Sequence, residues 1–199
     1  QRSKTGNGTQ AKVIAYPLKI YPMAELTANS IRLRDFSDLD QVRLAELCNN
    51  KKIWDNVRDL LPSPYTEENA LEFIRLCQQE VPATTFAIEY KGELAGCIGL
   101  VKQTDVYRLG AELGYWIGEP YWGMGIATQA VELITSYGFN KLGLVRIYSG
   151  VFEFNSASQR VLEKSGFKLE GISEKSVIKN GEILNEYKYA KLNPTPNHK

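Results

Sequence analysis

The hydrophobic positions of this chain switch repeatedly between strand spacing and helix spacing. Residues 111–118 alternate between an apolar face and a mixed face, which predicts a strand. From residue 127 the apolar positions recur every three or four residues, which predicts a helix with one face on the sheet. These positions are Ala127, Ala130, Val131, Ile134 and Tyr137. Residues 119–126 join the two elements, so the helix begins directly at this loop.

Similar patterns continue along the rest of the chain. Strands are predicted at residues 31–33, 84–90, 93–101, 144–152, 167–169 and 183–192. Capped helices are predicted at residues 37–47 and 66–79, and a short helix is predicted after Asn155. In the first of these helices we expect a mostly buried stripe, formed by Leu39, Val42, Leu44, Ala45 and Leu47. Residues 49–65 are expected to be a loop. Seven strands and about four helices in mixed order predict an α/β (α+β mixed) sandwich.

The loop before the helix at residue 127 carries Gly123 and Gly125. A helix start exposes unpaired N–H groups and the positive end of the helix dipole, so such a loop can bind phosphate oxygens without a lysine. The loop has no basic residue, which argues against a nucleotide-triphosphate P-loop, and the dinucleotide fingerprint lacks its third glycine. Taken alone, the loop also fits a strand-to-helix turn without any ligand.

A second motif follows the strand at 144–152, where the chain reads Asn-x-x-Ser-x-x-Val-Leu-Glu-Lys-x-Gly-Phe from Asn155 to Phe167. It accompanies Gly-Tyr-Trp-Ile at 114–117 and Tyr-Trp-Gly-x-Gly-x-Ala-Thr at 121–128. With these motifs the chain resembles the GNAT-superfamily N-acetyltransferases, and among them the Rim-type ribosomal-protein N-terminal (alanine) acetyltransferases. The resemblance extends, less specifically, from about Ile31 to Leu192.

This resemblance implies the GNAT acyl-CoA N-acyltransferase fold, a mostly antiparallel, twisted seven-stranded sheet with splayed central strands. It implies that acetyl-CoA is the co-substrate and lies between the strands at 112–117 and 144–152. The residues expected to bind it are Trp116, Ile117, Gly123, Met124, Gly125, Ile126, Ala127, Thr128, Asn155 and Ser158. For Asn155, simple helix capping is an alternative that is compatible with a cofactor contact.

Two residues are candidates for catalysis. Ser158 matches a serine that Rim-type members place near the cofactor sulfur, so it is our candidate proton donor to the departing thiolate. Many relatives carry a tyrosine where this chain has Leu162, and a purely local backbone contact of Ser158 is the alternative. Glu112 is our candidate base, directly or through water, whereas a structural, ion-paired glutamate is the competing interpretation. Some Rim-type members have a glutamate where this chain has Val177.

The acceptor pocket is expected at Trp54, Arg58, Asp59 and Tyr65, because relatives shape that side with their first two helices. For each residue, packing or a surface charge is the alternative. The expected reaction is direct attack of an amine on acetyl-CoA in a ternary complex. A peptide α-amino group, with a pKa of roughly 7.7–8.0, loses its proton more easily than an alkylammonium near ~10, so a protein or peptide N-terminus is the preferred acceptor. A small amine (polyamine, amino acid or aminoglycoside) and a non-catalytic acyl-CoA-binding module remain alternatives.

Composition and charge argue against some functions and locations of the protein. The 24 basic and 23 acidic residues of the 199 are interspersed, so neither a nucleic-acid nor a membrane-binding footprint is evident. We expect a cytoplasmic protein, because no apolar run approaches the ~20 residues of a membrane span and residues 1–10 are polar. One domain is expected at 27–192, between a partly flexible leader (1–26) and a disordered tail (193–199). The resemblance implies a monomer or homodimer.

The cysteines suggest no metal or thiol chemistry. Cys48, Cys77 and Cys97 lack metal-ligand spacing, and buried reduced thiols are expected. The sole histidine, His198, lies in the tail, which leaves a catalytic cysteine without a partner. No metal site is predicted.

Overall fold

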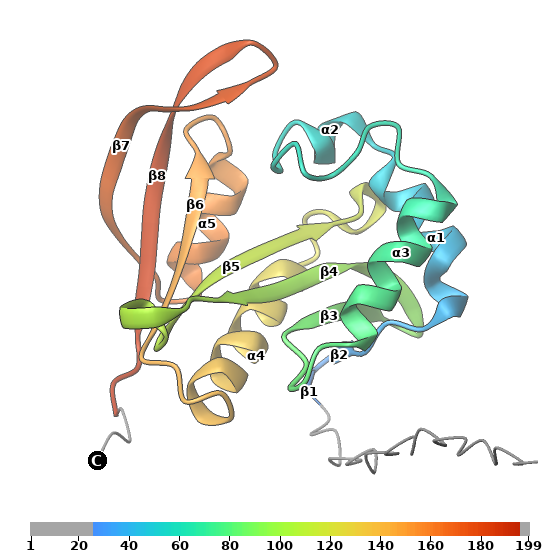
Figure 1. The fold of residues 1–199 in the computed structure, drawn as a ribbon, viewed down its shortest axis with the longest axis horizontal. Helices are drawn as coiled ribbons and strands as arrows, with labels where there is room; N and C mark the ends of the chain where they lie inside the picture. The colour runs from blue at the N-terminus through green and yellow to red at the C-terminus, as the bar shows by residue number, and fades with distance from the viewer. Residues whose placement is uncertain (1–25, 196–199) are drawn as a thin grey trace, which may run out of the picture.

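A mixed eight-stranded sheet forms the centre of the protein, seen in a computed structural model that describes residues 26–195 (Figure 1). The strand order is β1-β2-β3-β4-β5-β6-β8-β7, and only β5 and β6 pair in parallel. The strands are β1 (Leu26–Ala28), β2 (Ile31–Arg34), β3 (Thr85–Tyr90), β4 (Glu93–Lys102), β5 (Gly110–Ile117), β6 (Arg146–Phe152), β7 (Lys168–Lys179) and β8 (Glu182–Leu192). The helices are α1 (Gln41–Cys48), α2 (Lys51–Trp54), α3 (Glu67–Gln78), α4 (Ile126–Asn140) and α5 (Ser156–Lys164).

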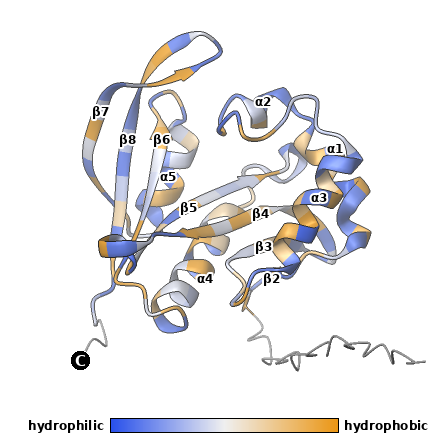
Figure 2. Ribbon diagram, in the orientation of Figure 1, coloured by the Kyte–Doolittle hydropathy of each residue, from blue (hydrophilic) through white to orange (hydrophobic). Residues whose placement is uncertain are grey.

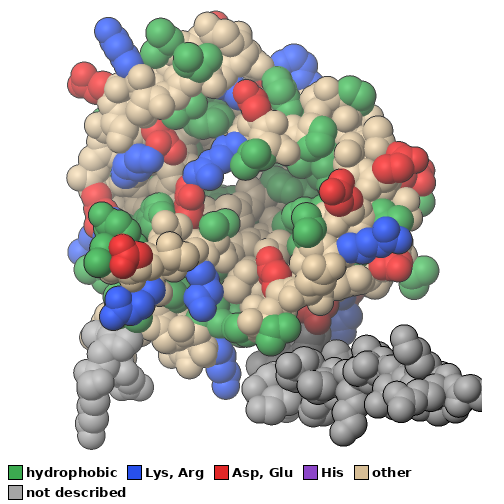
Figure 3. Space-filling model, viewed as in Figure 1, with side chains coloured by type: hydrophobic (Ala, Val, Ile, Leu, Met, Phe, Trp, Pro, Cys, Tyr) green, Lys and Arg blue, Asp and Glu red, His purple; other side chains and the backbone are tan. Residues whose placement is uncertain are grey.

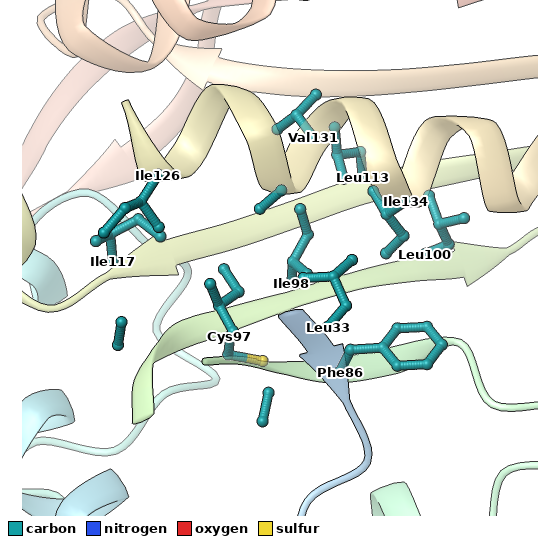
Figure 4. Close-up of a cluster of buried hydrophobic side chains, with 14 of the residues drawn as sticks. Leu33, Phe86, Cys97, Ile98, Leu100, Leu113, Ile117, Ile126, Val131 and Ile134 are labelled. Carbon is teal, nitrogen blue, oxygen red and sulfur yellow. The ribbon is translucent and has the colours of Figure 1, made fainter. Parts of the chain in front are cut away.

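The main core lies between the sheet and α4. Apolar residues of α4, among them Ile126, Val131 and Ile134, pack on Leu113 and Ile117 of β5 and on neighbouring side chains of β4 (Figure 4). This packing follows from the three- and four-residue spacing of α4 and the two-residue spacing of β5. It fixes the start of α4 beside the end of β5.

The opposite face of the central strands is covered by α1 and α3. Cys97 of β4 lies there near Cys48 of α1 and Cys77 of α3. Thr66 caps α3 by accepting a hydrogen bond from the Asn69 N–H. β4, buried on both faces, is rich in apolar residues, whereas β8 is largely hydrophilic (Figure 2). The strands therefore change from apolar in the middle of the sheet to mostly polar at its β7–β8 end.

The two central strands part after a short shared segment. β5 and β6 pair only from Gly110↔Arg146 to Glu112↔Tyr148, and β6 then stays with β8 as far as Phe152↔Glu186. The second half of β5 keeps β4 as a neighbour and loses β6. This confirms the expected GNAT-type arrangement of a mostly antiparallel sheet with splayed central strands.

The structure also corrects several expectations. The sheet has one strand more than predicted, β1, and the predicted loop at 49–65 contains the single-turn helix α2. β7 extends far beyond the predicted 167–169, because it is a polar strand with two bulges and no alternation to reveal it. The expected burial of Leu39 and Val42 is wrong: they are 94% and 50% exposed. A 3₁₀ turn at Asp38–Asp40 precedes α1 and shifts which positions face the core.

The expected hairpins, helices and free buried cysteines are present in residues 26–195. Within these residues no helix has the length and apolar character needed to cross a bilayer. Residues 1–25 of the predicted flexible leader and residues 196–199 of the predicted disordered tail lie outside the described residues, and the predicted domain limits stay a prediction.

Candidate functional site

The predicted glycine loop lies at the N-terminus of α4. Gly123 and Gly125 have φ values of +78° and +73°, in the left-handed region that favours glycine. The Trp122 indole N–H donates a hydrogen bond to the Ile117 carbonyl over 2.6 Å, which ties the loop to the end of β5. A side-chain carbon at Gly123 would meet no atom within 4 Å. The loop therefore presents its backbone to open space at the point where a helix begins.

The start of α4 has no side-chain cap, unlike the starts of α3 and α5. Its N-cap is Gly125, which carries no side chain. Asn155, by comparison, caps α5 by accepting a hydrogen bond from the Ser158 N–H at 3.0 Å. The first N–H groups of α4, from Ile126 to Thr128, are thus left for a ligand or water, together with the positive end of the helix dipole.

The start of α5 faces the gap where β5 and β6 part. Ser158 lies in the first turn of α5, and its hydroxyl is 2.8 Å from the phenol of Tyr115 on β5. The Ser149 hydroxyl of β6 donates to the Leu113 carbonyl over 2.9 Å, just beyond the last paired residues of these strands. Asn155 uses its amide oxygen as a cap, and its amide nitrogen remains a donor. Hydroxyl and amide groups from three elements thus converge on the gap.

The Tyr115 side chain, which extends from β5, is half-buried. Burial raises the pKa of the Tyr115 phenol to about 12, although its hydrogen bond with Ser158 acts in the opposite direction. The phenol is therefore protonated, and able to donate a hydrogen bond, throughout the neutral pH range.

Glu112 lies on the opposite face of β5 and is held in an ion pair. Strand alternation points Glu112 and Trp116 to one side and Tyr115 to the other. Arg58, from the segment after α2, donates to the Glu112 carboxylate, whose side chain is 20% exposed. Tyr148 of β6 is the cross-strand partner of Glu112. The ion-paired glutamate, left open as an alternative above, is thus present, and the pair joins a predicted catalytic residue to a predicted acceptor residue.

The end of the β7–β8 hairpin reaches over to α2, in what we call the hairpin contact: Trp54, Asp55, Asp59, Lys179 and Asn180. The Lys179 side chain is only 2% exposed; its ammonium lies 3.5 Å from the centroid of the Trp54 ring and 2.6 Å from Asp59. Asn180 donates to Asp55 over 2.9 Å. A cation–π contact and an ion pair offset the cost of burying this lysine. Two segments remote in sequence therefore enclose the side of the sheet on which Glu112 lies.

A hollow is visible in the middle of this face, between the β7–β8 hairpin and the part of the molecule formed by α1, α2 and α3 (Figure 3). The contacts above bring Trp54, Arg58, Asp59 and Glu112 into one neighbourhood. Tyr65, the fourth residue predicted for the acceptor pocket, is only 6% exposed and packs instead in the core near the three cysteines. Two other surface hollows are lined by Arg43 and Glu119 and by Tyr107 and Tyr148, and the second therefore adjoins Glu112, the cross-strand partner of Tyr148.

The buried cysteines are unsuited to nucleophilic catalysis. Burial raises the pKa of the Cys48 and Cys77 thiols to about 12, and it raises the pKa of Cys97 well above its usual value. At neutral pH these thiols are protonated, and the thiolate is the reactive form.

Comparison with known proteins assigns the family. The model of the acetyltransferase (GNAT) domain matches residues 30–168. The chain belongs to the GNAT family. GNAT members are acyltransferases that use acetyl-CoA, and the matched range includes both the glycine loop and the Asn155–Ser158 segment.

Individual relatives cover the chain to different extents. It is similar to spermidine N(1)-acetyltransferase of Escherichia coli K12, with 31% identity over 80% of this chain and 84% of that protein. It is also 38% identical to an uncharacterised N-acetyltransferase, YoaA, of Bacillus subtilis, over 51% of this chain and 57% of that protein. The match to YoaA thus spans little more than half of that relative's length.

A solved structure of RimL, the ribosomal L7/L12 α-N-protein acetyltransferase, in complex with coenzyme A has the same fold. Its TM-score is 0.74 at 20% identity, covering 83% of this chain and 95% of that one. The fold expected from the Rim-type resemblance is thereby confirmed.

Sequence patterns missed two parts of the site. The alternation of residues 111–118 placed the Tyr115 side chain on the apolar face of the strand, but no local pattern indicated its partner 43 residues away. Lys179 ends β7 and Asn180 lies in the turn that follows. Polar residues at such a turn are usually solvated, so no local pattern indicated their contacts with Asp59 and Asp55.

The hairpin contact predicts a local effect on stability. Lys179→Ala removes both the cation–π contact and the ion pair, which together contribute roughly 1–2 kcal/mol. Amide hydrogen exchange in residues 176–183 is expected to become about tenfold faster. Lys175→Ala removes an exposed lysine of the same strand and should leave exchange unchanged. Equal rates in the two variants would mean that Lys179 does not hold the hairpin.

Proposed function

We propose that this protein transfers an acetyl group from acetyl-CoA to a primary amine, by direct attack in a ternary complex. The observation that carries the proposal is the uncapped, glycine-led start of α4 beside the parting of β5 and β6. A helix start binds a pyrophosphate, and an unpaired strand edge binds the amide groups of a pantetheine arm as an added strand would. Family membership supports the same assignment.

In this proposal the amides from Gly123 to Thr128 bind the pyrophosphate of acetyl-CoA. The free edge of β5, at Trp116 and Ile117, and the amide nitrogen of Asn155 bind the pantetheine arm. The thioester then lies at the gap beside Ser158. Backbone N–H groups of β5 near Tyr115 to Ile117 stabilise the oxyanion that forms when the amine attacks the carbonyl.

Glu112 and Ser158 have complementary roles in the proposed reaction. Glu112 takes the proton of the acceptor ammonium, directly or through water, while the neutral nitrogen forms the new C–N bond. As the C–S bond breaks, Ser158 donates a hydrogen bond to the departing thiolate, which takes up the second proton lost by the acylated nitrogen and leaves as the thiol. Arg58, now paired with Glu112, would move or share that carboxylate when the acceptor binds.

The preferred acceptor in this proposal is the α-amino group of a peptide or protein. Carboxylates that would attract the further ammonium groups of a polyamine already have protein cations as partners: Glu112 has Arg58, Asp59 has Lys179, and Glu186 has Lys188. Spermidine is the second candidate, favoured by the 31% identity to a spermidine acetyltransferase over most of that protein.

The glycine loop gives the first functional prediction. Gly125→Ala places a β-carbon on a left-handed residue among the phosphate-binding amides, and the affinity for coenzyme A is expected to fall at least about tenfold by calorimetry. Gly143→Ala is the matched control, since Gly143 has φ +67° and open space around it but lies after α4. An equal loss of affinity in both variants would show that backbone strain causes the effect, and it would reject the glycine loop as the pyrophosphate-binding site.

The Arg58–Glu112 pair separates a catalytic from a structural glutamate. Glu112→Gln is expected to lower kcat/KM on the order of 10²-fold at neutral pH, because general-base catalysis contributes at least this much. Arg58→Gln retains the carboxylate and should cost far less in a steady-state assay. Equal losses, or a normal rate of Glu112→Gln at alkaline pH, would show that Glu112 is not a required base.

The acceptor class is tested by direct competition. The wild-type protein receives acetyl-CoA with equal concentrations of spermidine and a short peptide with a free N-terminus, and mass spectrometry follows both products. We expect kcat/KM for the peptide to exceed that for spermidine by at least about tenfold. Faster acetylation of spermidine would favour the second candidate. Coenzyme A binding without turnover of any amine in a wider panel would favour a non-catalytic module.

A further inference from the structure

The hydroxyl groups of Tyr115 and Ser158 form a pair that bridges β5 and α5. They lie 2.8 Å apart, a distance typical of a good O–H···O hydrogen bond. The next contact of the phenol, with the Ser158 backbone carbonyl, is longer, at 3.4 Å. The pair lies beside the point where β5 loses β6, and the Tyr115 ring packs against the edge of the core.

We propose that Tyr115 is a positioning residue, which donates a hydrogen bond to the Ser158 oxygen and so directs the Ser158 proton towards the cofactor sulfur. This inference rests on the proposed function, since it concerns the same thioester site.

Either hydroxyl can donate in the 2.8 Å contact, and the proposed role requires the phenol to be the donor. A serine hydroxyl has a single proton to donate. If that proton were donated to Tyr115, it could not be donated to the cofactor sulfur as well. A buried phenol that stays protonated supplies the proton of the shared bond instead, which leaves the serine proton free to point elsewhere. A hydroxyl that accepts one hydrogen bond also becomes a stronger donor in the next, because hydrogen bonds in a chain polarise one another.

The position of Ser158 in α5 restricts the directions in which its hydroxyl can form hydrogen bonds. Its N–H is already bound by Asn155, and its hydroxyl is in the first turn of α5, where the next residues continue the helix. Leu162, one turn later, is fully buried, so no second phenol occupies the usual place of a tyrosine in this helix. Tyr115 thus brings a phenol to the thiolate site from a strand, through Ser158, without donating its own proton to the sulfur.

An equilibrium measurement tests the pair without any acceptor amine. A hydrogen bond to the thiolate favours its charged form and lowers the thiol pKa of bound coenzyme A below the value of free coenzyme A. We expect the ultraviolet thiolate absorbance of the complex to show this lowered pKa in the wild-type protein. Tyr115→Phe and Ser158→Ala should each raise the thiol pKa by on the order of half a unit to one unit. Coenzyme A affinity at a pH below the thiol titration should hardly change.

A double-mutant comparison distinguishes positioning from general stabilisation. Adding Tyr115→Phe to Ser158→Ala should cause no further change in thiol pKa or in kcat, because Tyr115 acts through the Ser158 hydroxyl. Ser158→Thr, which keeps a hydroxyl, is expected to retain most of kcat. Tyr137→Phe is the matched control: it also removes a phenol that donates at 2.8 Å, to Ala83, from the last turn of α4.

The outcomes separate this inference from the function it rests on. Amine acetylation by the wild-type protein together with an unchanged thiol pKa and kcat in Tyr115→Phe would overturn the inference alone. Additive losses in the double variant, or equal losses in Tyr137→Phe, would overturn it too. A wild-type protein that acetylates no amine would overturn the proposed function, while the thiol pKa series would still decide on the hydrogen-bonded pair. If Tyr115→Phe fails to fold, loss of the lowered thiol pKa in Ser158→Ala and its recovery in Ser158→Thr support the pair, and its persistence in Ser158→Ala rejects it.

Discussion

The short pairing of β5 with β6 is the constraint on which the site depends. After Glu112↔Tyr148 the backbone groups on the free edge of β5 have no strand partner, and unpaired backbone groups are costly unless water or a ligand satisfies them. β6 is held away because it remains paired with β8, and Gly150 leaves room for the Glu186 side chain: a β-carbon there would lie 1.8 Å from the Glu186 carboxylate. The gap is therefore built into the sheet, and α4 and α5 supply polar groups at its edges.

The three longest helices, α3, α4 and α5, differ in how the unpaired N–H groups at their N-termini are satisfied. The starts of α3 and α5 are satisfied internally, by Thr66 and Asn155. The start of α4 is left open by Gly125, although α4 is the longest helix of the described residues and packs most deeply on the sheet. Burial of Ile126, Val131 and Ile134 stabilises α4 from its other face, so the helix tolerates an uncapped end. Packing thus stabilises α4 although its start has no side-chain cap.

Sequence patterns predicted those parts of the fold that are set locally. Alternation in β5 and helical spacing in α4 identified the loop between them, and the Asn155 cap was foreseen as one of two roles, because each depends on residues a few positions apart. Partners that come together only on folding were not predictable. The phenol of Tyr115 meets Ser158 across 43 residues, and Lys179 meets Asp59 across 120. Leu39 and Val42 were misassigned for a local reason, since a 3₁₀ turn changes the helical phase before α1 begins.

Strand alternation also keeps the two halves of the proposed reaction apart. Glu112 and Tyr115 are three residues apart on β5 and therefore point to opposite faces, one towards Arg58 and the other towards α5. A base and a hydrogen-bond donor on the same face could pair with each other and lose their separate functions. On opposite faces they can meet the same thioester only where the sheet opens, so the parting of β5 and β6 is what allows a proton to leave the amine on one side while the thiolate is stabilised on the other.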